Sequence, residues 1–527
     1  MNKLLRRDFL AWAAMSGAAA MVLPNEGWAS SRGFELEETT IDALQQAMAR
    51  GEVSSRSIVT AYIAQIKEID LRLNSVVEIN PDALTIAAQL DRERRAGRVR
   101  GPMHGIPVLI KDNIDTADSM KTTAGSLALL DAPAPREDAF IVRQLRLAGA
   151  VILGKTNLSE WANYRSTSSS SGWSARGGQT RNPYVLDRSP CGSSSGSGAA
   201  TSANLTAVSI GTETNGSIIC PSANQGLVGI KPTLGLVSRS GIIPIAESYD
   251  TAGPMTRTVA DAAIVLGALV GQDPRDARTA EAIRGLTDYR LHLRRDGLRG
   301  KRIGVARNYF GRVARVDALL EDHLKVLARE GAELLDITLD LKEAGEASGK
   351  VLNFEFKDGV NRYLVERGGA IKSLQDLIAF NEANAERQMP YFKQELFLEA
   401  EQTTSLESRQ YQLALLQART LSQEAIDGVM DAQRLDAIVG PSNGAAWPID
   451  LVNGDGGSRN SYVSSSSPAA IAGYPAITVP CGFITELPIG ISFWGRAFSE
   501  PVLIEIAYAF EQATQARRPP RLLPTYR

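Results

Sequence analysis

Short apolar runs alternate with amphipathic stretches along most of the chain. Between residues 36 and 100, apolar side chains such as Ile41 and Leu44 recur at helical spacing, which predicts helices. Uninterrupted apolar runs at residues 108–110 and 151–153 have the length and composition of buried strands. This alternation predicts an α/β fold in which most strands pair in parallel.

The same alternation continues to the C-terminus, except in one long segment. We expect further strands at residues 207–210, 227–230, 302–306, 334–337, 437–439, 476–479 and 489–493, and helices at residues 139–147, 196–205, 259–270, 316–329 and 503–514. Between residues 342 and 433 the pattern is helical and charged throughout. We therefore predict one large α/β domain over residues 30–527, with a helical insertion at about 342–433.

Residues 166–226 are unusually rich in Gly, Ser, Thr and Asn. Such a composition is also typical of flexible linkers. Here, however, strand-like sequence follows at residues 227–230, so the segment lies inside the folded core. Because long loops within a compact domain usually carry function, we expect the functional site in this segment.

The overall composition excludes several classes of partner. The 527 residues carry a formal net charge of -2, and no basic run or basic patch with interleaved aromatic residues is present. Neither nucleic acid nor an anionic membrane is therefore expected as the main partner. The sequence has no pair of neighbouring histidines and no Cys-x-x-Cys motif, so no metal site is predicted.

The chain contains three cysteines, Cys191, Cys220 and Cys481, which are too few for a disulfide framework. At most one bridge can form. Because cysteine often packs as a small apolar side chain, we interpret all three as buried packing residues rather than as nucleophiles.

The N-terminus has the order of a cleavable export signal. Arg6 and Arg7 precede a short apolar stretch at residues 11–23, and small residues follow at Gly27 and Ala29. The apolar stretch is shorter than the roughly 20 residues that a spanning helix needs. Residues 1–29 are therefore predicted to be a twin-arginine signal peptide, which implies a periplasmic protein without a stable membrane anchor after cleavage.

Two different serine motifs are candidates for nucleophilic catalysis. Residues 192–196 fit the short Gly-x-Ser-x-Gly pattern, with Ser194 at its centre. An esterase of the α/β-hydrolase type built on Ser194 would need a histidine, and His323 is its downstream candidate. The pattern is short and the segment before it is loop-like, so we expect this match to be accidental.

A longer set of motifs is more specific. Residues 192–197 read Gly-Ser-Ser-Ser-Gly-Ser, and residues 211–218 read Gly-Thr-Glu-Thr-Asn-Gly-Ser-Ile. Upstream blocks are residues 105–113, which contain Lys111, and residues 154–160. In this order the motifs resemble those of the amidase signature family, with a serine-to-serine spacing of 217 − 193 = 24. The similarity extends from about residue 35 to the C-terminus, and it implies an α/β fold with a large mixed central sheet flanked by helices.

The resemblance implies a role for each of three residues. Ser217 is expected to be the nucleophile, Ser193 the bridging serine and Lys111 the base, with no cofactor. The chemistry requires a neutral amine, because a charged lysine cannot accept the serine proton. Lys111 must therefore be desolvated, as it would be at the end of a buried strand.

The tetrahedral intermediate needs fixed donors for its oxyanion. Backbone N–H groups of Thr214, Asn215 and Gly216, together with that of Ser217, are the candidates, because glycine permits a tight loop before a helix. An Asn-Gly pair on its own is equally typical of a hairpin turn. Within the longer motif the oxyanion loop is the better interpretation.

Three departures from the family pattern affect the expected substrate. The chain has Glu213 where the family often has Asp, Asn215 where it often has Gly, and Ile219 where it often has Arg. The resemblance is greatest to bacterial peptide amidases, which implies amidated peptides or small carboxamides as substrates and no obligate protein partner. Two alternatives are an amidotransferase A-type subunit and a periplasmic binding protein that has lost catalysis.

Overall fold

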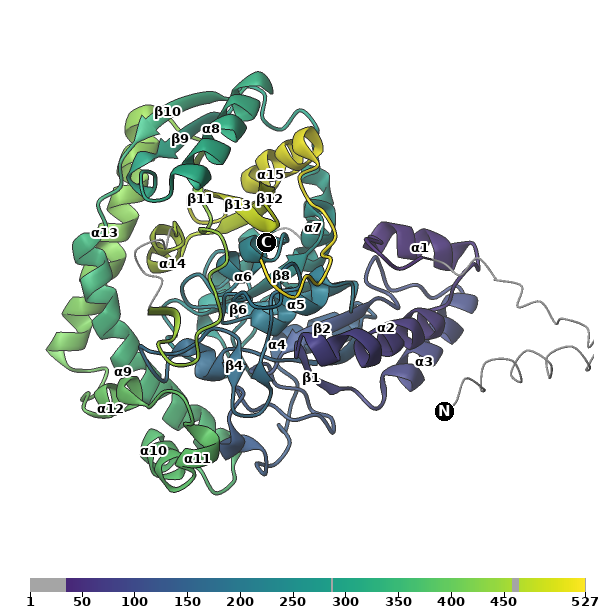
Figure 1. Ribbon diagram of the computed structural model, residues 1–527, viewed down its shortest axis with the longest axis vertical. Coiled ribbons are helices and arrows are strands. Elements are labelled where there is room, and N and C mark those ends of the chain that lie inside the picture. Colours follow the sequence, from purple (N-terminus) through teal and green to yellow (C-terminus); the bar gives the residue numbers. More distant parts are fainter. Residues whose placement is uncertain (1–34, 286–287, 457–463, 527) are drawn as a thin grey trace, which may run out of the picture. The chain divides into compact units, whose positions relative to one another are not determined.

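A mixed eleven-stranded sheet runs through the computed structural model, which describes residues 35–285, 288–456 and 464–526 (Figure 1). Its strand order is β1-β3-β2-β6-β8-β7-β12-β13-β11-β9-β10. The strands are β1 (Val76–Ile79), β2 (Pro107–Lys111), β3 (Val151–Thr156), β6 (Val208–Glu213), β7 (Val228–Lys231), β8 (Thr251–Thr256), β9 (Arg302–Ala306), β10 (Glu333–Ile337), β11 (Ala437–Pro441), β12 (Ala476–Ile484) and β13 (Leu487–Trp494). A separate hairpin joins β4 (Trp173–Ser174) to β5 (Gly178–Gln179).

The prediction of mostly parallel pairing is wrong. Parallel pairs occur only toward the two ends of the sheet, where β3, β2 and β6 pair in one group and β11, β9 and β10 in the other. The central strands from β6 through β8, β7, β12 and β13 to β11 are antiparallel. The tight connection between β12 and β13 explains part of this difference, because a short turn can join only antiparallel neighbours.

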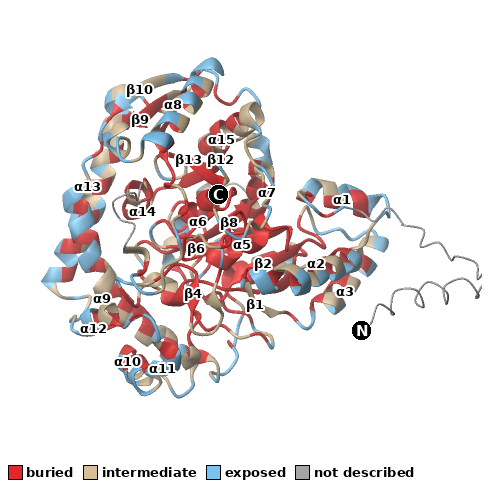
Figure 2. Ribbon diagram, viewed as in Figure 1, coloured by how far each residue is buried: buried red, intermediate tan, exposed pale blue. Residues whose placement is uncertain are grey.

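Helices flank the sheet, and Figure 2 shows that its central strands are buried while many outer helix faces are exposed. The α-helices are α1 (Ile41–Ala49), α2 (Ser55–Ile69), α3 (Ala83–Arg95), α4 (Phe140–Leu147), α5 (Ser195–Ser202), α6 (Ile219–Asn224), α7 (Val259–Leu269), α8 (Ala314–Arg329), α9 (Lys342–Arg367), α10 (Leu374–Ala383), α11 (Ala385–Gln388), α12 (Glu395–Glu401), α13 (Arg409–Gln433), α14 (Ser467–Ala472) and α15 (Glu500–Thr514). The predicted α/β fold with a mixed, helix-flanked sheet is confirmed.

Polar caps fix the starts of several helices. The Ser54 hydroxyl accepts the N–H of Ser57, and the Ser57 hydroxyl accepts the N–H of Ser54, which is a capping box at the start of α2. Thr258 caps α7 through a single bond, in which its hydroxyl accepts the N–H of Asp261. These contacts satisfy N–H groups that have no partner within the helix.

Two strands of the eleven-stranded sheet lie where the sequence predicted none, and so does the hairpin of β4 and β5. β1 interrupts the segment 36–100, which was predicted to be wholly helical, and pairs with β3 at the edge of the sheet. β8 reads Thr-Ala-Gly-Pro-Met-Thr, a composition poor in strand formers, yet it lies between β6 and β7. A Cβ atom at Gly253 would lie 2.0 Å from the carbonyl oxygen of Ile230, so the small residue is needed for this close strand packing.

The segment 342–433 consists of the helices α9 to α13, as the sequence predicted. α9 and α13 pack against each other, and α12 packs against α9. Their apolar side chains form one buried cluster with residues from the sheet region, including Val351, Phe354 and Phe397 from the insertion and Ile243 and Ile245 from outside it. The insertion is therefore part of the same core.

Residues Leu36–Arg527 form one compact unit. The predicted export signal, residues 1–29, lies outside the described residues. Within the described part of the chain, no helix combines the length and the apolar character needed to cross a membrane.

Candidate active site

Lys111 ends strand β2 and is fully buried. Its Nζ lies 2.8 Å from the hydroxyl oxygen of Ser193 and 2.8 Å from Thr212 Oγ1, with the Thr212 carbonyl oxygen at 3.3 Å. Asn113 Nδ2 donates to the same Thr212 hydroxyl at 3.0 Å. The predicted partners Lys111 and Ser193 are thus in direct contact, although 82 residues separate them.

Burial lowers the pKa of Lys111 from 10.5 to about 7, while the carboxyl groups of Asp250 and Glu213 act in the opposite direction. A large fraction of this amine is therefore neutral at neutral pH and can accept a proton from Ser193. The arrangement meets the chemical requirement that the sequence analysis set for a lysine base.

Ser193 follows a cis peptide bond after Gly192 and is completely buried. Its neighbour Ser194 is the N-cap of helix α5, and the Ser194 hydroxyl both donates to the Thr212 carbonyl at 3.0 Å and accepts the Thr212 N–H at 3.2 Å. Because that hydroxyl is engaged with the backbone of β6, Ser194 is badly placed to serve as the nucleophile of a short serine motif.

Ser217 lies in the turn between β6 and α6. The carboxylate of Glu213 shapes this turn by accepting the N–H groups of Ile218 at 2.7 Å and Ile219 at 3.0 Å. Gly216 has a φ of 86°, a conformation that favours glycine. In the described part of the chain, the N–H groups of Asn215, Gly216 and Ser217 donate to no protein group.

Side chains from other segments fix the start of this turn. The Thr214 hydroxyl donates to Asp250 Oδ1 at 2.6 Å. The Asn215 amide donates to Ser467 Oγ at 3.1 Å and accepts from Ser466 Oγ at 2.7 Å. The residues predicted to bind the oxyanion therefore lie in one loop whose position is set by distant segments.

The structure brings Lys111 and Ser193 into contact but forms no hydrogen bond between Ser193 and the Ser217 hydroxyl among the residues described. The two serine segments meet through the backbone, where Ser194 N–H donates to the Ser217 carbonyl at 3.2 Å. Sequence reasoning missed three residues that hold this site. Asn113 and Thr212 lie inside the recognised motifs, whereas Asp250 carries no sequence signal that would have identified it.

Two cavities meet at these residues. Cavity 1, of about 450 Å³, is lined by Ser193, Thr212 and Asn113. Cavity 2, of about 330 Å³, is lined by Ser217 and Gly216. The lining residues common to both are Ala162, Thr214 and Ile245. The predicted bridging serine thus borders one cavity, while the predicted nucleophile and oxyanion loop border the other.

Helix α9 contributes to both cavities. Arg362, Tyr363 and Glu366 line cavity 1, and Leu352 lines cavity 2. The helical insertion therefore forms part of the walls of both cavities.

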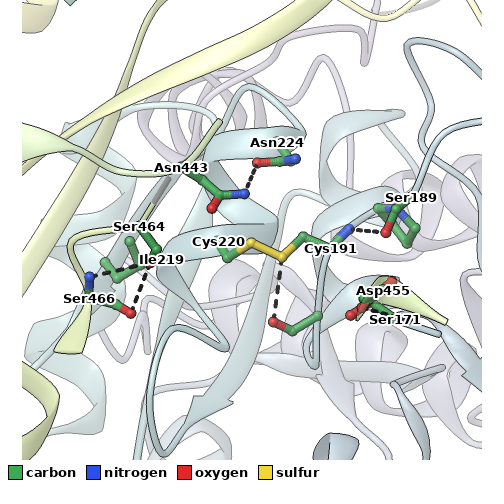
Figure 3. Close-up of a disulfide and its surroundings, with 12 residues drawn as sticks. Ser171, Ser189, Cys191, Ile219, Cys220, Asn224, Asn443, Asp455, Ser464 and Ser466 are labelled. Carbon is green, nitrogen blue, oxygen red and sulfur yellow. Dashed lines mark hydrogen bonds between the residues drawn. A yellow bond between two sulfur atoms is a disulfide. The ribbon is translucent and has the colours of Figure 1, made fainter. Parts of the chain in front are cut away.

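A disulfide joins Cys191 to Cys220 beside the two serines (Figure 3). The interpretation of all three cysteines as buried packing residues is incomplete for this pair, which forms the one bridge that the sequence allowed, whereas Cys481 is free and buried. The bridge connects the residue two positions before Ser193 with helix α6, which follows Ser217. Sequence spacing could not reveal it, because only the fold brings the two segments together.

The wall between the cavities contains three consecutive residues in the left-handed region, Trp161, Ala162 and Asn163, with φ values of 49°, 53° and 71°. A fully buried ion pair flanks them, in which Arg165 Nε lies 2.8 Å from Glu160 Oε1. Arg165 Nη1 also donates to two backbone carbonyls near α12, at Phe392 and Lys393, each at 2.9 Å. The insertion thus helps to hold the segment that separates the cavities.

Two further lysines are fully buried away from the cavity linings. Lys155 at the end of β3 donates to the Ile114 carbonyl and to the Thr122 hydroxyl, and burial lowers its pKa to about 8. Lys231 at the end of β7 donates to the Tyr474 carbonyl at 2.6 Å, and burial lowers its pKa to about 8 as well. Neither forms a hydrogen bond with Ser193 or Ser217, so burial alone does not single out the predicted base.

His323, required by the esterase alternative, lies on α8, where its ring packs against Phe510 at 5.5 Å between centroids. It lines neither cavity. That alternative therefore lacks its base. Among the described residues, no group of three or more His, Cys, Asp or Glu side chains is arranged to bind a metal ion.

The chain is similar to several known proteins over most of its length. The native peptide amidase of Stenotrophomonas maltophilia has a solved structure that is 50% identical, with a TM-score of 0.88 over 93% of this chain and 99% of that chain. A probable amidase of Arabidopsis thaliana is 43% identical over 506 residues, which cover 94% of this chain and 93% of that protein. The A-type subunit of the glutamyl-tRNA(Gln) amidotransferase from Thermoanaerobacter pseudethanolicus is 34% identical over 497 residues, which cover 93% and 99% of the two chains.

The amidase family model matches residues 57–504, which is most of the chain. The matched region contains both serine segments, Lys111 and the helical insertion. The chain thus belongs to the amidase signature family and is an amidase, an enzyme that hydrolyses the carbon–nitrogen bond of amides.

Proposed function

We propose that the amide is cleaved through a seryl ester on Ser217, with Ser193 as proton relay and Lys111 as base. The contact of 2.8 Å between Lys111 Nζ and Ser193 Oγ is the observation that carries this proposal. The lowered pKa of Lys111 supports it, because a partly neutral amine can take the Ser193 proton.

The reaction then has two halves. Ser193 accepts the proton of Ser217 Oγ as it passes its own to Lys111, and Ser217 Oγ attacks the amide carbon. The N–H groups of Asn215, Gly216 and Ser217 stabilise the oxyanion. The relay then returns a proton to the nitrogen, the carbon–nitrogen bond breaks and the amine leaves. Water, activated by the same relay, hydrolyses the ester and releases the acid.

As substrates we infer short peptides that carry a carboxyl-terminal amide, from which the enzyme releases ammonia. The similarity to the Stenotrophomonas maltophilia peptide amidase supports this substrate class. Cavity 2 supports it as well, because about 330 Å³ beside Ser217 is within the range of pockets that bind small organic ligands.

Ammonia release from amidated dipeptides and from simple carboxamides tests the proposal. Ser217→Ala should reduce release from amidated peptides by at least about 10⁴-fold. Ser194→Ala, which removes the centre of the short serine motif, should retain activity within about tenfold. Activity that survives in Ser217→Ala would overturn the mechanism.

Other outcomes would change only the substrate. Release from small carboxamides alone would retain the serine mechanism and exclude peptides. Activity that appears only with a co-purifying subunit would favour the amidotransferase alternative, and the absence of turnover on every amide would favour a binding protein.

We also propose that the protein is exported through the twin-arginine route into the periplasm. The Arg6-Arg7 pair followed by a short apolar stretch supports this location. So does the Cys191–Cys220 disulfide, because such bonds persist mainly in oxidising compartments. Replacing both arginines with lysines should trap the uncleaved protein in the cytoplasm, and unchanged secretion would refute the route.

A further inference from the structure

The side chain of Asn215 makes hydrogen bonds that do not belong to a local turn. In an ordinary turn an asparagine side chain bonds to the backbone about two residues further on. Here the Asn215 amide nitrogen donates to Ser467 Oγ at 3.1 Å, and the amide oxygen accepts from Ser466 Oγ at 2.7 Å. These partners lie 252 and 251 residues further along the chain. The side chain therefore connects the loop before Ser217 to a distant segment.

That distant segment is the start of helix α14. Ser466 occupies the N-cap position of α14, where a serine commonly accepts an N–H group of its own helix, but its side chain makes no capping hydrogen bond. Its hydroxyl donates to Asn215 instead. A Cβ atom at Gly216 would lie 3.0 Å from the same Ser466 hydroxyl oxygen, so the loop and the start of α14 are in close contact. The needs of α14 alone do not explain this arrangement.

Helix α14 is itself held in place by its neighbours. Ser422 and Gln423 of α13 donate to the carbonyl oxygens of Pro468 and Ala472, each at 3.0 Å. Ala472 also belongs to the same buried apolar cluster as Ile219 of α6. The segment that holds Asn215 is therefore part of the packed core and is bonded to a helix of the insertion.

The loop that carries Asn215 needs such an anchor. The N–H groups of Asn215, Gly216 and Ser217, which are proposed to bind the oxyanion, donate to no protein group within the described residues. Gly216 lies between the other two with a φ of 86°, and glycine has more conformational freedom than any other residue. Donors stabilise a developing oxyanion most when their directions are fixed before the reaction begins.

We propose that the Asn215 side chain is a positioning residue, which fixes the oxyanion loop against α14 so that the loop N–H groups face the carbonyl oxygen of the amide. This inference rests on the proposed roles of Ser217 and of the loop N–H groups. The negative charge on that oxygen is greatest in the transition state. Removing the side chain should therefore slow the reaction more than it weakens substrate binding.

Variants on both sides of the contact test this inference with an amidated dipeptide as substrate. Asn215→Ala should lower kcat at least about tenfold and change KM less than about threefold. Ser466→Ala should lower kcat at least about threefold, and adding it to Asn215→Ala should cost less than about twofold more, because both changes remove one interaction.

Asn308→Ala provides a matched control. Asn308 is exposed like Asn215, and its side chain accepts the N–H of Leu339 at 3.1 Å, but it lines neither cavity. Its kcat should stay within about twofold of the wild type. The urea midpoint of Asn215→Ala should also change little, because hydrogen bonds at an exposed side chain contribute modestly to the stability of a fold.

Two inhibitors separate positioning from a general structural effect. When a peptide aldehyde binds, Ser217 Oγ adds to the carbonyl carbon, the serine proton passes through Ser193 to Lys111, and the hemiacetal oxyanion faces the loop. The matching peptide alcohol binds without forming a bond. In Asn215→Ala the inhibition constant of the aldehyde should rise by the factor by which kcat/KM falls, and that of the alcohol should stay within about twofold.

Three results would overturn the inference while the proposed function stands. They are full kcat in Asn215→Ala, losses that multiply in the double variant, and equal weakening of both inhibitors. Activity that survives in Ser217→Ala would instead mean that the proposed function itself fails.

Discussion

Two regions of the molecule are packed in different ways: the segment that carries the two serines, and the helical insertion. In the serine segment, small and polar residues are buried so tightly that several glycines have no room for a methyl group; at Gly196 a Cβ atom would lie 2.3 Å from the Ser75 carbonyl oxygen. In the insertion, long amphipathic helices pack through ordinary apolar side chains such as Val351 and Phe354. The proposed catalytic residues therefore lie in a region with little space for larger side chains. The cavity walls come partly from helices that pack through ordinary apolar contacts.

The largest expected effect is a difference in kcat between variants of two equally buried lysines, Lys111 and Lys155. Lys111→Met should reduce kcat by about 10³-fold, because it removes the proposed base. Lys155→Met should leave kcat within about tenfold but lower the free energy of unfolding by about 3 kcal/mol, since Asp112 and Asp115 lose a buried cation. Steady-state kinetics and urea unfolding of both variants measure the difference. Similar kinetic losses would mean that burial, and not contact with Ser193, makes Lys111 important.

The next contrast compares one glycine from each region. Gly196→Ala should destabilise the protein by about 3 kcal/mol, because backbone atoms on two sides leave no space for the methyl group. Gly349→Ala on the exposed side of α9 should stabilise it by about 0.5–1 kcal/mol, because nothing lies within 4 Å of the new methyl and alanine favours the helix. Equal shifts in the urea midpoint would contradict the inference that the serine segment is packed more tightly than the insertion.

Loss of the disulfide should have a comparable cost within the serine segment. The bond closes a loop with a sequence separation of 29, so replacing both Cys191 and Cys220 with serine should lower the free energy of unfolding by about 3 kcal/mol. Thermal inactivation should accelerate as well, since the bridge links the segments before Ser193 and after Ser217. Cys481→Ser provides the control. A double variant as stable as the wild type would show that packing alone positions the serines.

The smallest expected effect concerns pH. Below pH 7 the kcat/KM value should rise with pH, because Lys111 must lose its proton to act as base, and it should level off above about pH 7. The Asp250 carboxylate raises the pKa of Lys111, so Asp250→Asn should move the rising limb to lower pH by a fraction of a unit. A shift to higher pH would contradict the proposed direction of this interaction.

Sequence patterns predicted the strands that show an unbroken apolar run and missed those whose formation depends on their neighbours. β2 and β3 are fully buried, so each shows an unbroken apolar run. β1 is only partly buried and follows helical sequence, and β8 is rich in small residues because it is squeezed between two strands. Neither feature is visible without the tertiary structure.

The residues of the candidate site also fall into two groups, those that sequence motifs identify and those that only the structure identifies. Lys111, Ser193 and Ser217 could be selected because they lie in long motifs whose order is informative. Asp250 and the Cys191–Cys220 bridge could not, because their roles arise from contacts between segments that only folding brings together. The boundary at residue 30 and the export signal remain sequence predictions.

The three buried lysines also affect how the whole protein responds to alkali. Lys111, Lys155 and Lys231 have pKa values of about 7, 8 and 8 in the folded chain, against 10.5 in the unfolded one. Around pH 9 the folded protein therefore holds them largely as neutral amines, and unfolding takes up about three protons from solution. Because the unfolded chain binds more protons, these groups make the folded state more stable as pH rises from about 8 to 10. The burial that lowers the pKa of the proposed base therefore also contributes to the stability of the folded protein at alkaline pH.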